Sequence, residues 1–195
     1  MDRFLFILVI VIAYFLGNIS PAIIIGKVNG VDIKKEGSGN AGTTNVLRVV
    51  GKKSAVITLV TDILKGFVAV EIGFLLSSEL AGMICVAAAV IGHVWPVLYH
   101  FQGGKGVAVA FGGVLAVNWQ LGLVALGIVA VGLLLSKRMS FGSIIGAGTF
   151  PILTYFMEPD FFLISIVFAT ILIYKHRGNI VRLIKGEEPK MSFKK

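Results

Sequence analysis

Residues 4–25 read FLFILVIVIAYFLGNISPAIII, and these 22 consecutive positions hold no charged side chain. At a rise of about 1.5 Å per residue, a helix of this length matches the roughly 30 Å hydrocarbon core of a bilayer. The run resembles the apolar part of a secretory signal peptide, but Asp2 and Arg3 make a poor basic start for one. We therefore expect a retained first transmembrane helix.

The rest of the chain is also poor in charge. Of its 195 residues 56% are hydrophobic and 14% are charged, whereas soluble domains average about 25% charge. The formal net charge of +8 would suggest nucleic acid as the partner of a soluble protein. Here the basic residues lie between apolar runs, which favours membrane lipids and phosphorylated substrates as partners and excludes nucleic acid. We expect a single polytopic membrane domain over residues 1–195.

Five further apolar runs follow the first one, at residues 54–76, 80–99, 107–135, 141–156 and 161–174. The run 107–135 fits either one long tilted helix or two short helices that turn at residues 118–120. Basic residues after the first run place that segment in the cytoplasm, and only the two-helix arrangement returns the later basic segments to the same side. We therefore predict an all-α integral membrane protein with seven transmembrane helices, an external N-terminus and a cytoplasmic C-terminus.

Two features of these spans bear on packing. Val107–Val117 makes only about 16 Å of helix. This helix either starts earlier, around Gly104, or reaches only part-way across because its loop dips into the bundle, which would line a recessed, wet pocket on the cytoplasmic side. Small residues would let the helices approach closely. The glycines expected to do so are Gly112, Gly113, Gly122, Gly127 and Gly132.

The first polar loop, residues 37–48, reads GSGNAGTTNVLR. Small residues let the backbone turn several N–H groups toward one point, hydroxyl and amide side chains add donors, and residues 43–50 could open a helix. Arg48 adds a two-pronged guanidinium that suits phosphate. The candidate ligands of a phosphate are Ser38, Gly39, Asn40, Gly42, Thr43, Thr44, Asn45 and Arg48. The alternative is a flexible Gly/Ser linker followed by a helix cap.

The second polar loop, residues 101–106, reads FQGGKG. Its one cation, Lys105, lies among glycines that permit close backbone approach. These are Gly103, Gly104 and Gly106. A Walker A loop is excluded, because Tyr99 and Gly106 stand where that motif needs a glycine and a hydroxyl residue. Pro96 should end the preceding helix. The alternative is a structural turn.

The third polar loop, residues 176–188, reads HRGNIVRLIKGEE and follows the last apolar run. His176 and Asn179 are three residues apart and would share one face of a helix, which Gly186 should end before Glu188. Basic residues of this loop would alternatively anchor the chain to anionic lipid. These are Arg177, Arg182 and Lys185.

Asp62 and Lys65 lie three apart in the second apolar run and can pair across one helical turn. Charge inside a membrane indicates function, although a structural pair explains these two residues almost as well. Glu71, on the same run, has no assigned role. Cys85 is the only cysteine, and the three histidines lack ligand spacing with it or with acids, so no metal and no cofactor are expected.

Together these segments resemble the bacterial acyl-phosphate-dependent glycerol-3-phosphate acyltransferase family, the PlsY type. The matching stretches are LGNISPA (16–22), GSGNAGTTNVLR (37–48), DILKG (62–66), GHVWPVLYHFQGGKGVA (92–108) and HRGNIVRLIKGEE (176–188), in the family's order over nearly the whole chain. Departures from the family pattern at Asn18, Ser20, Gln102 and Gly178 remove no charged or hydroxyl group with an assigned role.

The resemblance implies seven transmembrane helices and synthesis of lysophosphatidic acid in the bacterial inner membrane, with the active site toward the cytoplasm. Acyl phosphate and glycerol 3-phosphate are the implied substrates. We assign catalysis to Ser38, Arg48, Lys105, His176 and Asn179, and structural roles to Asp62, Lys65 and Glu188. Further substrate binding is assigned to residues 39–45 of the first polar loop, to the glycine loop (residues 103–106) and to Arg182. Acyl phosphate is already activated, so we expect direct transfer without an acyl-enzyme intermediate. His176 or a substrate phosphate oxygen would take the proton, and we expect a monomer.

Two other classes are compatible with the residues alone. A transporter of phosphate or of an organic phosphate would use glycine-rich breaks and intramembrane charges, but transporters often have repeated halves, and the two glycine loops are not in equivalent places. A purely structural membrane subunit explains neither the hydroxyl-rich loop nor the lysine between glycines.

Overall fold

The computed structural model describes residues 2–191, and every regular element in that range is a helix. The all-α prediction is confirmed for this part of the chain. Two compact units divide it, residues 2–117 and residues 118–191.

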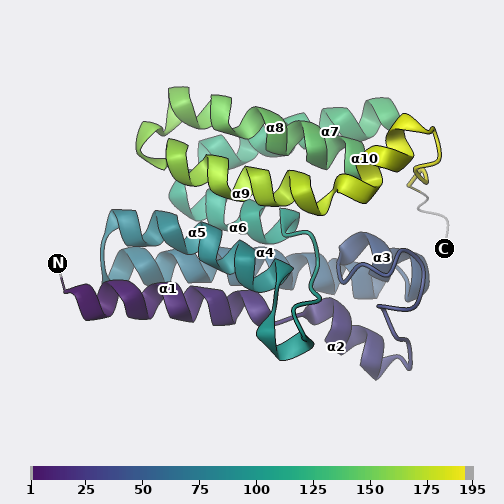
Figure 1. The fold of residues 1–195 in the computed structure, drawn as a ribbon, viewed down its shortest axis with the longest axis horizontal. Coiled ribbons are helices and arrows are strands. Elements are labelled where there is room, and N and C mark those ends of the chain that lie inside the picture. Colours follow the sequence, from purple (N-terminus) through teal and green to yellow (C-terminus); the bar gives the residue numbers. More distant parts are fainter. Residues whose placement is uncertain (1, 192–195) are drawn as a thin grey trace. The chain divides into compact units, whose positions relative to one another are not determined.

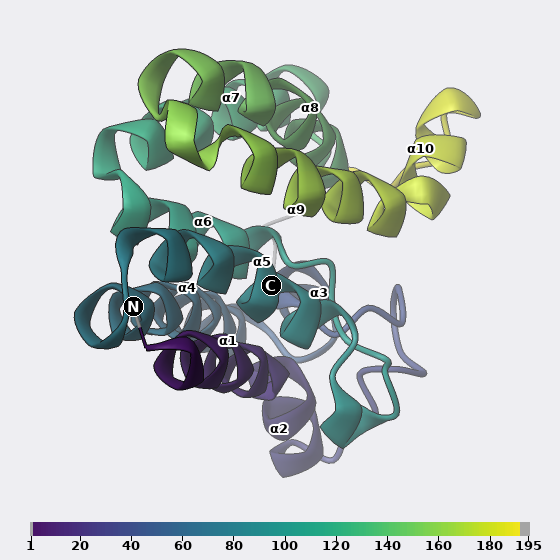
Figure 2. The same cartoon turned by 60° about the vertical axis from the view of Figure 1, so that its left-hand side comes forward.

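The first unit is a bundle in which α1, α4, α5 and α6 pack on one another (Figures 1 and 2). The short helices α2 and α3 pack against α4 and carry the polar segment between the first two long helices. The elements are α1 (Arg3–Asn18), α2 (Pro21–Val28), α3 (Thr43–Val49), α4 (Lys52–Leu76), α5 (Glu79–Val94), the short 3₁₀ helix η1 (Val97–Tyr99) and α6 (Val107–Val117).

Glycines set how closely these helices approach. A methyl group on Gly17 of α1 would collide with the Ala89 carbonyl of α5, and one on Gly112 of α6 would collide with the Ile63 carbonyl of α4. The prediction of close packing at Gly112 is therefore confirmed. It is wrong for Gly127, since a side chain there would meet no described atom within 4 Å.

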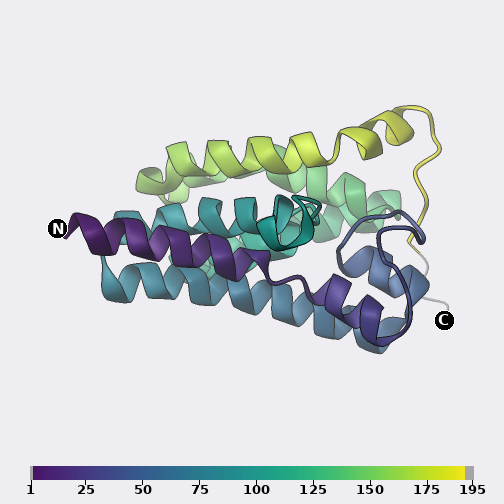
Figure 3. The ribbon, with the colours of Figure 1, turned by 60° about the horizontal axis from the view of Figure 1, so that its bottom comes forward.

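The first apolar run is not one continuous helix, contrary to the sequence prediction. A break at Ile19 and Ser20 separates α1 from α2, and Figure 3 shows the two as separate helices at the purple, N-terminal end of the chain. Pro21 has no N–H to continue α1, and the Ser20 side chain accepts a hydrogen bond from the backbone N–H of Ile23, which caps α2. The sequence prediction overlooked Ser20 and Pro21 as the start of a second helix, because they lie within a continuous apolar run.

The run at residues 107–135 consists of two helices, as the charge distribution predicted. Val117 ends α6, and α7 begins at Trp119. Asn118 makes the break, because its side chain accepts a hydrogen bond from the backbone N–H of Leu121 at 3.0 Å. The expected end of a helix just before Pro96 is also observed, since α5 ends at Val94.

The second unit contains α7 (Trp119–Ser136), α8 (Met139–Met157), the short 3₁₀ helix η2 (Pro159–Phe161), α9 (Phe162–Lys175) and α10 (Arg177–Ile184). Its interior between α8 and α9 is aromatic, with the rings of Phe150, Phe161 and Phe168 in mutual contact. The hydroxyls of Thr154 and Ser165 hydrogen-bond to each other at 2.8 Å in the same interior.

Four segments are long and apolar enough to cross a membrane: Arg3–Val28, Glu79–Tyr99, Trp119–Ser136 and Met139–Met157. A fifth is added if Pro159–Lys175 and Arg177–Ile184, which meet at an angle of 56°, form one span. Large apolar side chains such as Phe4, Leu134 and Leu135 are exposed on these helices, which suits contact with lipid.

Candidate active site

Asn45 holds the first polar loop together. Its side-chain Oδ1 accepts a 2.8 Å hydrogen bond from the backbone N–H of Ser38, and its Nδ2 donates to the carbonyls of Ile33 and Glu36 at 3.0 Å each. Gly37 has a φ of +62°, and any side chain there would meet the Asn45 amide. These contacts form a tight turn in which Ser38 is exposed.

The other predicted ligands of this loop lie along the path from Gly39 to α3. Asn40, Gly42, Thr43, Thr44 and Arg48 are all half-buried. The Oγ1 atom of Thr43 is buried and has no hydrogen-bond partner among the described residues. Arg48 lies in the last turn of α3, whose start at Thr43 agrees with the predicted helix.

The glycine loop packs directly against the end of α5. The backbone N–H groups of Gly103 and Gly104 donate to the carbonyls of Val94 and His93 at 3.2 and 3.1 Å. Both glycines are buried, Lys105 between Gly104 and Gly106 is half-buried, and Gly106 has a φ of +87°. This path is open only to glycine, because a methyl group on Gly103 would collide with the His93 carbonyl.

The first loop and the glycine loop lie in contact. A methyl group on Gly104 would meet both the Ala41 carbonyl of the first loop and Nε2 of His93. Lys34, just before the first loop, places its Nζ atom 3.5 Å from the Gly103 carbonyl. Two polar loops separated by more than fifty residues in the sequence therefore form one cluster in the first unit.

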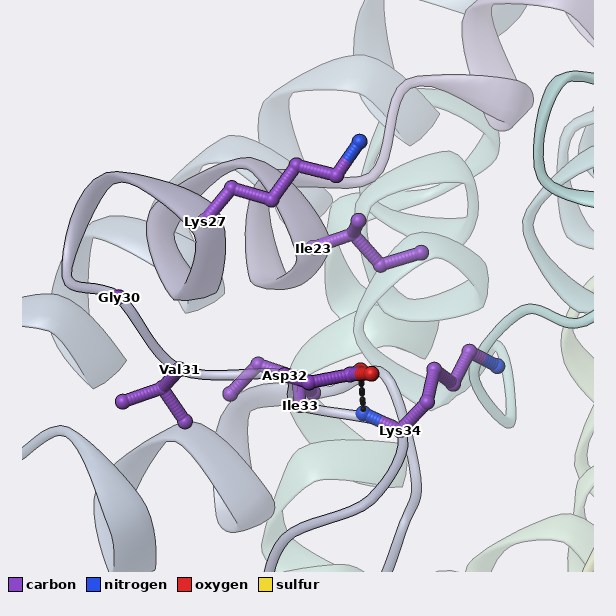
Figure 4. A pocket seen from close by; sticks show the side chains of 7 residues that line it. All are labelled: Ile23, Lys27, Gly30, Val31, Asp32, Ile33 and Lys34. Atoms are coloured by element: carbon purple, nitrogen blue, oxygen red, sulfur yellow. Dashed lines mark hydrogen bonds between the residues drawn. The ribbon is translucent and has the colours of Figure 1, made fainter.

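Beside this cluster, the segment from α2 to the first loop encloses a cavity of about 350 Å³. Figure 4 shows its lining residues, Ile23, Lys27, Gly30, Val31, Asp32, Ile33 and Lys34. The Asp32 carboxylate accepts a hydrogen bond from the backbone N–H of Lys34 at 3.0 Å. No residue predicted for the active site lines this cavity.

In the second unit, His176 lies at the junction of α9 and α10, and both it and Asn179 are buried. His176 Nδ1 is 2.7 Å from the carbonyl oxygen of Leu172. A carbonyl only accepts, so Nδ1 carries the proton and Nε2 of the neutral ring is a hydrogen-bond acceptor. The predicted helix after His176 is α10, and the chain leaves it through Gly186 at a φ of +74°.

Beyond that turn Glu188 joins α10 to the start of α8 within the second unit. Its buried carboxylate accepts hydrogen bonds from Asn179 at 2.6 Å, Arg182 at 2.7 Å and Ser140 at 2.7 Å. Arg138 donates to the Glu188 backbone carbonyl at 2.8 Å. Burial alone would raise the pKa of the Glu188 carboxyl, but these donors and the Arg182 charge hold that pKa below its ordinary value.

Sequence reasoning missed Ser140 and Arg138 as partners of Glu188. Arg138 belongs to one of the later basic segments from which the topology was predicted, and Ser140 did not enter the prediction. Their distance of about fifty residues from Glu188 in the sequence gave no signal that the start of α8 meets Glu188.

The predicted pair Asp62–Lys65 is confirmed. The Lys65 Nζ atom lies 2.8 Å from a carboxylate oxygen of Asp62, and both side chains are buried in the first unit. Nζ also lies 2.9 Å from Nδ1 of His93, a residue of the second motif that sequence reasoning left without a role.

Long apolar helices joined by short polar segments define a multi-pass helical membrane protein. Its family follows from direct comparison: the sequence pattern of the family described as "Glycerol-3-phosphate acyltransferase" matches residues 7–186, and the chain belongs to that family. The resemblance inferred from the motifs is confirmed.

Individual relatives agree. The chain is 42% identical over 203 residues to a glycerol-3-phosphate acyltransferase of Clostridioides difficile, covering 100% of both chains, and 44% identical to one of a Thermoanaerobacter species, covering 96% of both. It is similar to a crystal structure of PlsY (YgiH), an integral membrane glycerol 3-phosphate acyltransferase in its glycerol 3-phosphate form. The TM-score is 0.92, with 34% identity and 96% of each chain covered. The lysophosphatidic acid form of that protein gives a TM-score of 0.89.

Proposed function

We propose that this protein moves a fatty acyl group from acyl phosphate to glycerol 3-phosphate and so makes lysophosphatidic acid and inorganic phosphate. The observation that carries the proposal is the contact between the hydroxyl-rich first loop and the lysine-bearing glycine loop at Ala41 and Gly104, in a chain of this family. Two phosphorylated substrates need cations and N–H donors with little negative charge, and this cluster supplies them.

Arg48 and Lys105 are proposed to bind phosphate groups and to stabilise phosphate as it leaves. Ser38 adds a hydroxyl donor from an exposed turn. Asn45 acts by shaping that turn, since its amide is occupied by three backbone groups of the loop. The acyl chain would stay among the apolar helices, in contact with lipid.

His176 and Asn179 are proposed to bind the glycerol hydroxyls. Nε2 of His176 accepts in the neutral ring, and the Asn179 amide directs its N–H to Glu188, so each side chain offers an acceptor. In the reaction, the glycerol oxygen bonds to the acyl carbon and the bond from that carbon to the phosphate oxygen breaks. The hydroxyl proton goes either to His176 Nε2 or to an oxygen of the substrate phosphate.

Transfer is proposed to be direct, with no acyl group held on the protein. Acyl phosphate is reactive enough that the main task is to place the hydroxyl near the acyl carbon. Ser38 is the side chain of the first loop that could compete as a nucleophile. Mass spectrometry of protein incubated with acyl phosphate alone should find no acylated Ser38, and an acyl adduct there would mean a two-step mechanism.

Acyl phosphate is proposed as the donor in preference to a thioester. The sequence lacks the box of a histidine followed five positions later by aspartate that marks other acyltransferases: Leu98, Lys105 and Val181 stand at those places.

We further propose that α1 and α4 to α9 are the seven membrane spans of a monomer in the bacterial inner membrane, with the N-terminus outside and the C-terminus in the cytoplasm. The helix α4 is 25 residues long, and its central charge on Asp62 is matched by Lys65, which makes a span of that composition tolerable. Cys85 is fully buried, so the native chain suits thiol labelling.

This topology is testable with exposed positions. An impermeant maleimide added to intact cells should label Asp160→Cys, between α8 and α9, and should not label Lys53→Cys, at the start of α4. The reverse pattern would invert the proposed orientation.

The activity itself is tested with purified protein in detergent or lipid, given acyl phosphate and glycerol 3-phosphate. Inorganic phosphate and lysophosphatidic acid should appear in equal amounts, with acyl-CoA and acyl-carrier protein inactive as donors. Activity with a thioester donor would refute the donor assignment. No product, together with uptake of labelled glycerol 3-phosphate or phosphate into sealed vesicles, would mean a transporter.

A further inference from the structure

The ammonium group of Lys65 makes three hydrogen bonds inside the first unit. It donates to the carbonyls of Gly17 at 3.1 Å and Ile19 at 2.5 Å, where α1 ends, and it lies 2.9 Å from His93 Nδ1. Asp62, at 2.8 Å, balances its charge. With Asp62, four acceptors therefore share the three N–H donors of the ammonium.

The His93 ring is held between this pair and the glycine loop. Its Nδ1 atom lies 2.9 Å from Lys65 Nζ and 3.5 Å from a carboxylate oxygen of Asp62. In the neutral ring with its proton on Nε2, Nδ1 accepts from the ammonium. The Nε2 edge of the ring lies against Gly104 of the glycine loop.

His93 also supports the glycine loop through its backbone. Its carbonyl accepts the hydrogen bond from the Gly104 N–H at 3.1 Å, and the His93 ring fills the space that a side chain on Gly104 would need. A continuous series of contacts thus runs from Asp62 through Lys65 and His93 to Gly104, next to Lys105.

We propose that His93 is a positioning residue that holds the glycine loop in the shape that binds the phosphate of glycerol 3-phosphate, and that Lys65 acts through it. This inference rests on the proposed function for the identity of the ligand. It gives the buried Asp62–Lys65 pair a role in substrate binding, where sequence reasoning assigned a structural one.

Two variants of His93 separate its two contacts. In His93→Asn, the amide can keep an acceptor near the Nδ1 position for Lys65, but nothing reaches Gly104. In His93→Gln, the longer side chain can restore an N–H near the Nε2 position. Glu71→Gln is the matched control, since Glu71 is a half-buried charged residue of the same helix as Lys65 and belongs to none of these contacts.

The first measurement is hydrogen–deuterium exchange of the purified full chain, which needs no substrate. In His93→Asn the amides of residues 103–106 should exchange about tenfold faster than in the unchanged protein, because the ring no longer packs against Gly104 and the loop opens more often, while Glu71→Gln should leave them unchanged. Lys65→Met combined with Asp62→Asn, which removes both charges together, should have the same effect as His93→Asn.

The second measurement is steady-state kinetics. The KM for glycerol 3-phosphate should rise about tenfold in His93→Asn and recover toward the original value in His93→Gln, with kcat and the KM for acyl phosphate little changed. Faster exchange without a change in this KM, or a uniform loss of all parameters, would overturn the inference and leave a structural role.

Exchange at residues 103–106 that stays at the original rate in His93→Asn would also overturn the inference. A failure of the proposed function is distinguishable, because it would be seen as absent product with the unchanged protein, before any variant is compared.

Discussion

Asn179 donates a 2.6 Å hydrogen bond to Glu188, a residue nine positions later that returns to it after the turn at Gly186. The bond fixes which end of the Asn179 amide faces the carboxylate. Asn179→Asp would put a second carboxylate at this distance and remove the donor. We expect the variant to lose roughly 3 kcal/mol of stability, the cost of a broken hydrogen bond to a buried charge.

The control for that variant is a double variant that swaps the two side-chain types. In Asn179→Asp combined with Glu188→Gln, donor and acceptor are swapped, so thermal unfolding should return toward the original midpoint. If the double variant is as unstable as the sum of the two single ones, the bond does not couple these residues.

The depressed pKa of Glu188 predicts a pH dependence of stability. A carboxyl group whose pKa is lower in the folded state contributes stability that is fully present above its unfolded pKa, about 4.5, and is lost as the pH falls through the folded value. Unfolding midpoints should therefore drop below pH 4.5. Glu188→Gln, which cannot titrate, should show a smaller drop, and an equal drop in both proteins would contradict the assignment.

Gly104→Ala should impair binding of glycerol 3-phosphate, because the added methyl group meets the Ala41 carbonyl and the His93 ring. We expect at least about a tenfold rise in the KM for this substrate, because the backbone at Ala41 cannot move away without changing the shape of the first polar loop. Gly127→Ala is the matched control. It adds the same methyl group where no described atom lies within 4 Å, and should leave activity unchanged and stabilise α7 slightly.

Ser38→Ala, Arg48→Ala and Lys105→Ala should each lower turnover without unfolding the bundle. In Arg48→Ala and Lys105→Ala we expect turnover to fall about 100-fold or more, as it does when a group that stabilises developing charge is removed. Lys53→Ala, an exposed lysine at the start of α4, serves as the control for net charge. Unchanged turnover in all three variants would refute the assignment of the active residues.

The sequence by itself determined the class of fold and the three polar loops. Apolar runs of membrane length form helices in the described residues because a helix satisfies its backbone hydrogen bonds within the segment. The break at Asn118 and the pair Asp62–Lys65 were predictable for a related reason, since a cap and a pair three residues apart are local. The break at Ser20 was missed although its capping signal is equally local.

Only the tertiary structure decided which distant groups meet. His93 is 28 residues from Lys65, Ser140 is 48 residues from Glu188, and the partner of Gly104 is the Ala41 carbonyl, a backbone atom that no side-chain pattern identifies. The physical reason is that local preferences determine where helices begin and end, whereas contacts between them depend on which surfaces pack. Through those contacts the Asp62–Lys65 salt bridge, which was predicted to be structural, is proposed to support the glycine loop that binds substrate.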